Sequence, residues 1–173
     1  ALEWGPIAVL RQDPTGFTNI TETLGLAGKI GWWTSIAAGD FDNDGHMDLV
    51  AGNWGRNTPY ERHRHPGPGD SESALPLRLY HGDFNNDGTY DVIEAVHATP
   101  PGRYVPVQPL GPLTQALPFL RGRFPSHAAF GQAGVDELLG NAFRTAKVLE
   151  ATWLESTVFL NRGGSFDAHP LPI

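Results

Sequence analysis

Residues 36–52 read IAAGDFDNDGHMDLVAG, and residues 81–96 read HGDFNNDGTYDVIEAV. In each stretch a nine-residue acidic loop separates two short apolar runs, and both loops follow the pattern D-x-[DN]-x-D-G-x-x-D. Short apolar runs bounded by Gly, Asn and Asp are typical of β-strands joined by a turn. The sequence therefore predicts two β-hairpins with acidic tips, at residues 40–48 (the first loop) and 83–91 (the second loop), and an internal repeat of a β unit.

The alternate positions of both loops carry oxygen-bearing side chains. In a tightly wound loop these positions face the same interior, so oxygens from positions 1, 3, 5 and 9 can converge on one hard cation, with a main-chain carbonyl from position 7. Carboxylates packed this closely repel one another unless a cation lies among them. We predict two Ca²⁺ sites. The predicted ligands are Asp40, Asp42, Asp44, His46 and Asp48 in the first loop, and Asp83, Asn85, Asp87, Thr89 and Asp91 in the second, with His46 and Thr89 binding through the main chain.

The remaining loop positions also recur. Gly45 and Gly88 occupy position 6, where the chain turns sharply and a residue without Cβ adopts positive φ at no cost. Apolar side chains stand at positions 2 and 8, and we expect them to pack beneath the loops: Phe41 and Met47 in the first, Phe84 and Tyr90 in the second.

Two alternatives compete with a calcium-binding hairpin. An Asp-Gly or Asn-Asp cluster alone is often only a solvated turn, but two matching copies favour a shared metal-binding purpose. The second loop also has Glu94 at position 12, as an EF-hand would, whereas the first has Ala51 there. An EF-hand needs helices on both sides, and these flanks have strand character. We therefore prefer the hairpin interpretation.

The rest of the chain adds strands and one helical stretch. The 21 glycines and 15 prolines among 173 residues favour short strands and turns. Apolar residues at helical spacing, Leu113 to Leu120 and Val135 to Leu139, predict short helices within about residues 112–150. Residues 157–166 (TVFLNRGGSF) predict another hairpin. The predicted fold class is mainly β with a small helical insertion.

These residues carry a family resemblance. Residues 36–45 and 48–52 resemble the FG-GAP or VCBS repeat, the calcium-bearing blade of integrin-α-like β-propellers. Residues 17–21 (FTNIT) and 158–166 resemble the strands that flank such repeats in bacterial proteins related to cartilage acidic protein and UnbV.

The resemblance implies a partial β-propeller spanning residues 1–173 as a single repeat region. Its blade-like units are expected at about residues 17–75, 76–110 and 151–173, with the helical insertion at 112–150. A closed propeller needs at least four blades. We therefore expect a fragment of a longer propeller, whose exposed edges pair with the rest of that propeller or with a partner subunit.

Composition narrows the partners and the compartment. The net charge of −7 disfavours a nucleic-acid partner, because phosphate binding needs clustered Lys and Arg. No apolar run is long enough for a membrane span. The chain has no cysteine, so metal binding or packing must provide the stabilisation that disulfides give other exported domains. We expect an exported protein, extracellular, cell-surface or periplasmic, whose signal lies outside this sequence.

Motifs for catalysis are not evident in the sequence. It has no G-x-S-x-G, H-E-x-x-H or P-loop pattern. We therefore expect no enzyme activity, no catalytic residues and no organic cofactor, but a calcium-stabilised binding or scaffold module with a protein or carbohydrate ligand. The alternative is part of a propeller-based enzyme, such as a polysaccharide lyase.

Two further groups of residues have open interpretations. Arg62 to His65, with His63 and His65, form a basic patch that we interpret as a solvated loop, with a metal or anion site as the alternative. Trp32, Trp33 and Trp54 are predicted to fill the core, with stacking on sugar rings as the alternative.

Overall fold

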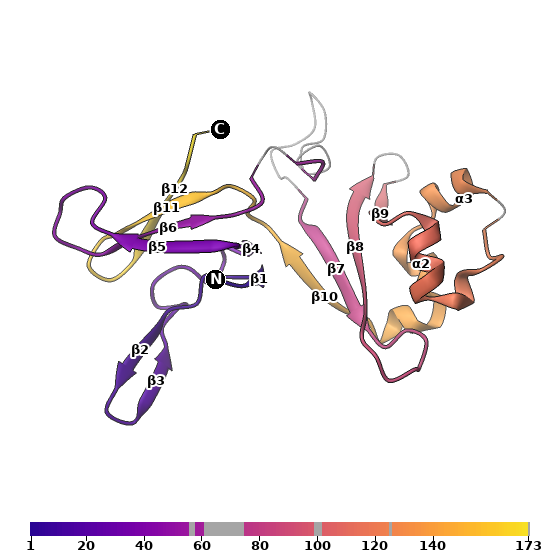
Figure 1. Cartoon of the computed structure of the whole chain (residues 1–173), viewed down its shortest axis with the longest axis horizontal. Helices are drawn as coiled ribbons and strands as arrows, with labels where there is room; N and C mark the ends of the chain where they lie inside the picture. Colours follow the sequence, from indigo (N-terminus) through magenta and orange to yellow (C-terminus); the bar gives the residue numbers. More distant parts are fainter. Residues whose placement is uncertain (56–57, 61–74, 99–101, 125, 173) are drawn as a thin grey trace. The chain divides into compact units, whose positions relative to one another are not determined.

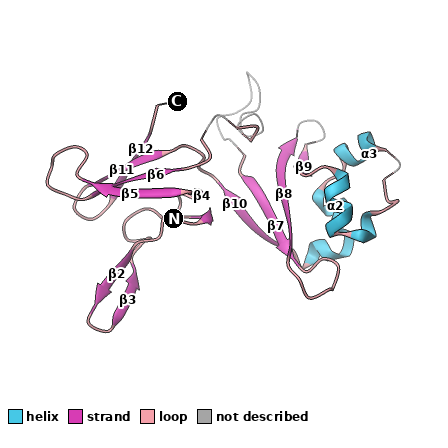
Figure 2. Cartoon of the chain, in the orientation of Figure 1, coloured by secondary structure: helices cyan, strands magenta, loops and turns pink. Residues whose placement is uncertain are grey.

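A computed structural model describes residues 1–55, 58–60, 75–98, 102–124 and 126–172. The described chain is mainly β, with several antiparallel sheets and a few short helices, as the sequence predicts (Figure 2). The strands are β1 (Glu3–Gly5), β2 (Leu10–Asp13), β3 (Gly16–Asn19), β4 (Gly31–Trp32), β5 (Ser35–Gly39), β6 (Asp48–Gly52), β7 (Leu77–Gly82), β8 (Asp91–Ala98), β9 (Arg103–Pro106), β10 (Lys147–Ala151), β11 (Thr157–Asn161) and β12 (Phe166–Pro170). The helices are α2 (Leu110–Ala116), η1 (Pro118–Leu120), α3 (His127–Gln132), α4 (Val135–Leu139) and η2 (Gly140–Arg144).

The chain divides into two compact units. The outer unit joins Ala1–Glu61 to Ala151–Ile173, and the middle unit is Arg62–Glu150. Each acidic loop belongs to a different unit. The basic patch at residues 62–65 lies outside the described residues.

A four-stranded antiparallel sheet positions the first loop in the outer unit. Its strand order is β12-β11-β6-β5, and the pair Gly39 and Asp48 closes the β5–β6 hairpin (Figure 1). Strand β11 runs antiparallel to β6, with Phe159 opposite Leu49, so the end of β11 lies beside the start of β6. The turn between β11 and β12 and the first loop therefore lie at the same end of this sheet.

The core of the outer unit lies against this sheet. Thr157 and Phe159 alternate inward along β11 and are fully buried, as a strand periodicity of two requires. Trp33 packs edge-on against Phe159, with ring centroids 5.6 Å apart. The buried cluster consists of Ile7, Leu26, Trp33, Ala51 and Phe159. This packing holds β6 and β11 together close to the first loop.

The middle unit packs helices against a second sheet. Its strand order is β10-β7-β8-β9, and the pair Gly82 and Asp91 closes the β7–β8 hairpin that carries the second loop. The helices follow β9 and lie beside this sheet (Figure 1). Ile93 from β8 and Leu138 from α4 are both fully buried in the core between them. Burial of a side chain of this size contributes about 1.5–3 kcal/mol.

One strand lies where the sequence predicts helix. The helices run from Leu110 to Arg144, but Lys147–Ala151 forms β10, a neighbour of β7. A run as short as KVLEA has no periodicity that distinguishes a strand from a helix. Its pairing with β7 therefore determines that it forms a strand. The sheet of β5 and β6 also includes β11 and β12, and so draws on two of the predicted blade-like units.

Candidate metal centre

Main-chain N–H groups wrap the first loop around the carboxylate of Asp40. The N–H groups of Asp44 and Gly45 donate to the two oxygens of Asp40, each at 3.1 Å. The N–H of His46 donates to Asp44 at 2.8 Å. Asn43 and Gly45 have φ of 58° and 87°, which gives the loop its tight curvature. The loop is therefore built around its first aspartate rather than over an apolar base.

Asp48, at the ninth position, connects the loop to the sheet. It is fully buried, and its two oxygens accept hydrogen bonds from the N–H groups of Phe41 and Asn161, both at 2.8 Å. The bond from Asn161 is the largest influence and holds the pKa of Asp48 below its ordinary value, although burial acts in the opposite direction. Asp48 therefore remains an ionised carboxylate inside the fold.

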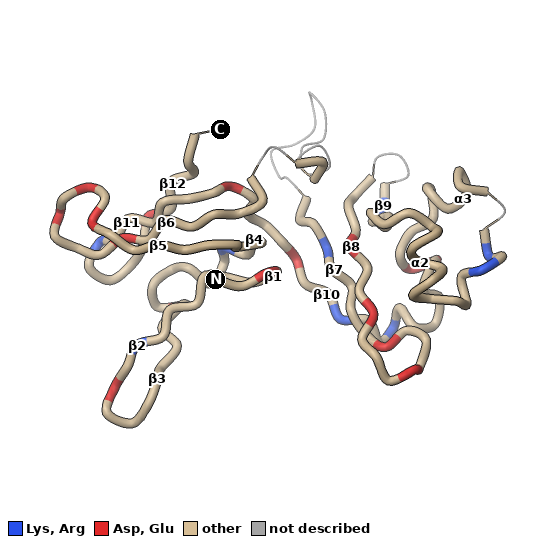
Figure 3. The backbone as a smooth tube through the Cα atoms, viewed as in Figure 1, with Lys and Arg blue, Asp and Glu red and all other residues tan. Residues whose placement is uncertain are grey.

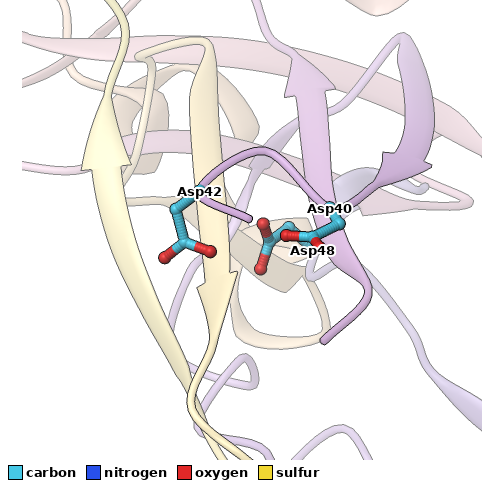
Figure 4. Close-up of side chains that lie close together, drawn as sticks. All are labelled: Asp40, Asp42 and Asp48. Carbon is cyan, nitrogen blue, oxygen red and sulfur yellow. The ribbon is translucent and has the colours of Figure 1, made fainter. Parts of the chain in front are cut away.

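Three carboxylates of the first loop converge. Oxygens of Asp40, Asp42 and Asp48 all lie within 4.8 Å of one another. Figure 4 shows Asp40 and Asp48 next to each other, with Asp42 to one side of them. Two oxygens bound to one Ca²⁺ at its usual distance are at most about 5 Å apart. Because a carboxylate oxygen has two lone pairs, it can accept an N–H bond and still bind a cation. The three side chains fit such an ion.

Arg162, in the turn after β11, also contacts the first loop. Its Nη1 lies 2.6 Å from Oδ2 of Asp42 and 3.1 Å from Oδ2 of Asp44. Asp44, a predicted ligand, is thus paired with a guanidinium and is not in the converging group. The sequence places Arg162 in a Gly-rich turn, but its position beside the first loop depends on the pairing of β11 with β6, which is not readable from the sequence.

The second loop repeats the hydrogen bonds of the first. Asp83 accepts from the N–H groups of Asp87 and Gly88, at 3.1 and 3.0 Å, and Asp91 accepts from that of Phe84 at 3.0 Å. The N–H of Thr89 donates to Asp87 at 2.8 Å. Asn86 and Gly88 have φ of 58° and 85°. Figure 3 shows acidic residues in both loops. The repeat predicted from sequence is therefore also a repeat of backbone conformation.

The charges of the second loop are less well compensated. The amide Nδ2 of Asn85 donates to Asp87 at 2.8 Å and to the carbonyl of Ala116 at 3.3 Å. Burial is the main cause that raises the pKa of Asp91, and the charges of Asp87 and Asp83 act in the same direction. A converging group of three acidic side chains is not found here among the described residues. The carbonyls of His46 and Thr89 remain predicted ligands in the two loops.

The predicted packing beneath the loops is wrong for three of four residues. Phe84 is 5% exposed, but Phe41, Met47 and Tyr90 are 50%, 59% and 65% exposed. The loops are shaped by bonds between carboxylates and main-chain N–H groups, which leave no apolar interior to fill.

Instead, each phenylalanine lies against a glycine that precedes its loop. A Cβ at Gly39 would lie 3.2 Å from the ring of Phe41, and one at Gly82 would lie 3.0 Å from that of Phe84. A side chain at either glycine would crowd the ring unless the ring moved by a few tenths of an ångström.

The structure excludes one of the sequence alternatives and shows where the three tryptophans lie. Strands flank both loops, so the EF-hand interpretation is excluded. Trp33 is buried in the core, as predicted. Trp32 and Trp54 are half-buried, and their rings stack with centroids 4.4 Å apart. Tyr60 stacks on Trp54, with ring centroids 4.3 Å apart.

Comparison with known proteins identifies one repeat. Residues 1–51 match the family model described as an FG-GAP-like repeat, a range that includes the whole first loop. Searches of curated proteins and of solved structures gave no match. Among the described residues, no helix has the length and apolar character needed to cross a membrane.

Proposed function

We propose that this chain is a calcium-binding and calcium-stabilised module of the binding or scaffold type, with one Ca²⁺ at each acidic loop. The convergence of Asp40, Asp42 and Asp48 is the observation that carries the proposal. The FG-GAP-like repeat over residues 1–51 supports a module related to β-propellers. The matching hydrogen bonds of the second loop extend the proposal to that loop.

The proposed ligands keep the sets derived from the sequence. In the first loop they are Asp40, Asp42, Asp44 and Asp48 with the carbonyl of His46; in the second they are Asp83, Asn85, Asp87 and Asp91 with the carbonyl of Thr89. A bound Ca²⁺ offsets two of the four negative charges of the first loop and two of the three of the second. The ten ligands come from loops already wound around their first aspartates, so little chain ordering opposes binding.

A structural role for the cation is favoured over a catalytic one. Asp40 and Asp48 each accept two main-chain hydrogen bonds, which hold them in place as parts of the fold. With an affinity typical of extracellular modules, about 10⁻⁴ to 10⁻³ M, each site contributes about 0.4–1.4 kcal/mol at millimolar calcium.

The wider setting follows from the same resemblance. We propose that the two four-stranded antiparallel sheets are blades of a partial propeller in an exported protein, related to the bacterial cartilage acidic protein and UnbV group. Millimolar calcium outside the cell suits sites of this affinity. The partner is a protein or carbohydrate ligand, or the remainder of the same propeller.

Calorimetric titration of the full chain with CaCl₂ tests the proposal. The expected result is two bound ions per chain. Asp40→Asn and Asp83→Asn are each expected to remove one ion, whereas Asp136→Asn, a carboxylate exposed on α4, is the matched control and keeps both. Binding that survives in the Asp40→Asn and Asp83→Asn double variant would contradict the assignment of the loops.

A further inference from the structure

We propose that Arg162 sets the calcium affinity of the first loop, because its guanidinium competes with the cation for the carboxylates of Asp42 and Asp44. The inference rests on the proposed calcium binding and deepens it. It predicts different calcium affinities for the two loops, since the first must displace the Arg162 guanidinium before it binds its metal. It also means that calcium binding at the first loop changes the contacts of the β11–β12 turn, which carries Arg162.

The contacts of Arg162 are short and involve two predicted ligands. Nη1 lies 2.6 Å from Asp42 and 3.1 Å from Asp44, which is hydrogen-bond distance to both. A guanidinium is always charged at physiological pH and forms its bonds in a fixed plane. Asp42 is one of the three converging carboxylates. A cation at the first loop and Arg162 therefore draw on the same two carboxylates, and because both are positively charged they repel each other there.

The fold delivers Arg162 to the first loop. The preceding residue, Asn161, donates its N–H to Asp48 at 2.8 Å and its Nδ2 to the carbonyl of Met47 at 3.1 Å. The N–H of Arg162 donates to the carbonyl of Ser165 at 2.8 Å, which closes the turn. These bonds fix the backbone at Arg162, so only its side chain has to be ordered when it reaches the loop.

The contact is nevertheless reversible. The side chains of Arg162, Asp42 and Asp44 are 37%, 28% and 31% exposed, so water screens the pairs. Arg162 also has another partner, because its Nε lies 3.3 Å from Asp167 on β12. When a divalent cation takes Asp42 and Asp44, the guanidinium can stay on Asp167. Arg162 thus lowers the affinity without blocking the site.

The second loop has a different arrangement. No ion pair among the described residues involves Asp83, Asp87 or Asp91; the side chains of Asn85 and Thr89, both uncharged, bond to Asp87. An amide carries no net charge to be displaced. The competition is therefore specific to the first loop, and its removal should leave the second loop unchanged.

Calcium titrations of Arg162→Gln in the Asp83→Asn background, which leaves the first loop as the binding site, test the inference. The expected result is an affinity about three- to tenfold tighter than in Asp83→Asn alone. Arg103→Gln is the matched control, because Arg103 pairs with Glu137 outside both loops, and it should leave the affinity unchanged. An affinity within about twofold of the parent, or a weaker one, overturns the role of Arg162.

Two further measurements keep the test decisive. If Arg162→Gln fails to fold, Arg162→Met replaces it; methionine removes the positive charge but keeps an unbranched side chain, and unchanged affinity overturns the inference. In the unmodified chain, the NMR signals of the Arg162 Nη–H groups, which contact Asp42 and Asp44, should shift as calcium is added, while those of Arg103 stay. No shift at saturating calcium overturns the inference. Absence of calcium binding in the unmodified chain instead contradicts the proposed function.

Discussion

The N–H of Asn161 donates a 2.8 Å hydrogen bond to the carboxylate of Asp48, across 113 residues of sequence. The bond connects the end of β11 to the last residue of the first loop. A second bond, from Phe41 to the other oxygen of Asp48, connects the same carboxylate to the start of the loop. One buried side chain therefore joins the loop at both ends to the sheet.

Asp48→Asn is expected to destabilise the outer unit even in the presence of EDTA. The amide retains one oxygen but directs an NH₂ group at a main-chain N–H, so a buried donor loses its acceptor. The midpoint of urea unfolding should fall relative to the unmodified chain. Asp42→Asn, at a more exposed position of the same loop, is the control and should have a smaller effect. Equal midpoints for Asp48→Asn and the unmodified chain would contradict the structural role.

Substitution of the glycines before the loops should have unequal effects. Gly82→Ala places a Cβ 3.0 Å from the buried ring of Phe84 and is expected to cost about 1–3 kcal/mol by overpacking. Gly39→Ala should cost less, because Phe41 is half exposed and its ring can move away. Gly164→Ala, where a Cβ would meet no atom within 4 Å, is the control. Urea unfolding measures the three, and a larger loss for Gly39→Ala would contradict this account.

The two loops should respond differently to acid. The pKa of Asp91 is raised in the folded chain and that of Asp48 is lowered. As pH falls, Asp91 therefore takes up its proton first, and a protonated carboxyl binds calcium poorly. Ionised Asp91 also costs the folded state stability above its raised pKa, and in EDTA this cost is relieved as pH falls through that pKa.

Calcium titrations at about pH 5.5 and about pH 4.5 measure this difference. Asp40→Asn isolates the second loop, and Asp83→Asn isolates the first. The affinity of the second loop should fall by the larger factor over this range. Equal losses in the two variants would show that the environments of Asp91 and Asp48 do not control binding.

Local features of the fold were predictable from the sequence, and long-range ones were not. The positions of Asp40 and Asp83 before Gly45 and Gly88 are enough to predict two hairpin tips, because the turn is made within nine residues. Strand β10 and the contacts of Arg162 depend on which strands pair in the sheets. These pairings join segments that are far apart in the sequence, so no local pattern predicts them. Phe41 was mispredicted for a related reason: an apolar residue indicates burial only where the fold provides an interior.

Thermal unfolding of the full chain in excess CaCl₂, in excess MgCl₂ and in EDTA tests calcium binding most directly. Because calcium binds the folded loops and not the unfolded chain, it should raise the melting temperature by several degrees over EDTA. Magnesium should have a much smaller effect, since it demands a tighter octahedron and loses water reluctantly. Superimposable melting curves in calcium and in EDTA would contradict the account, because the two loops would then be turns without a metal.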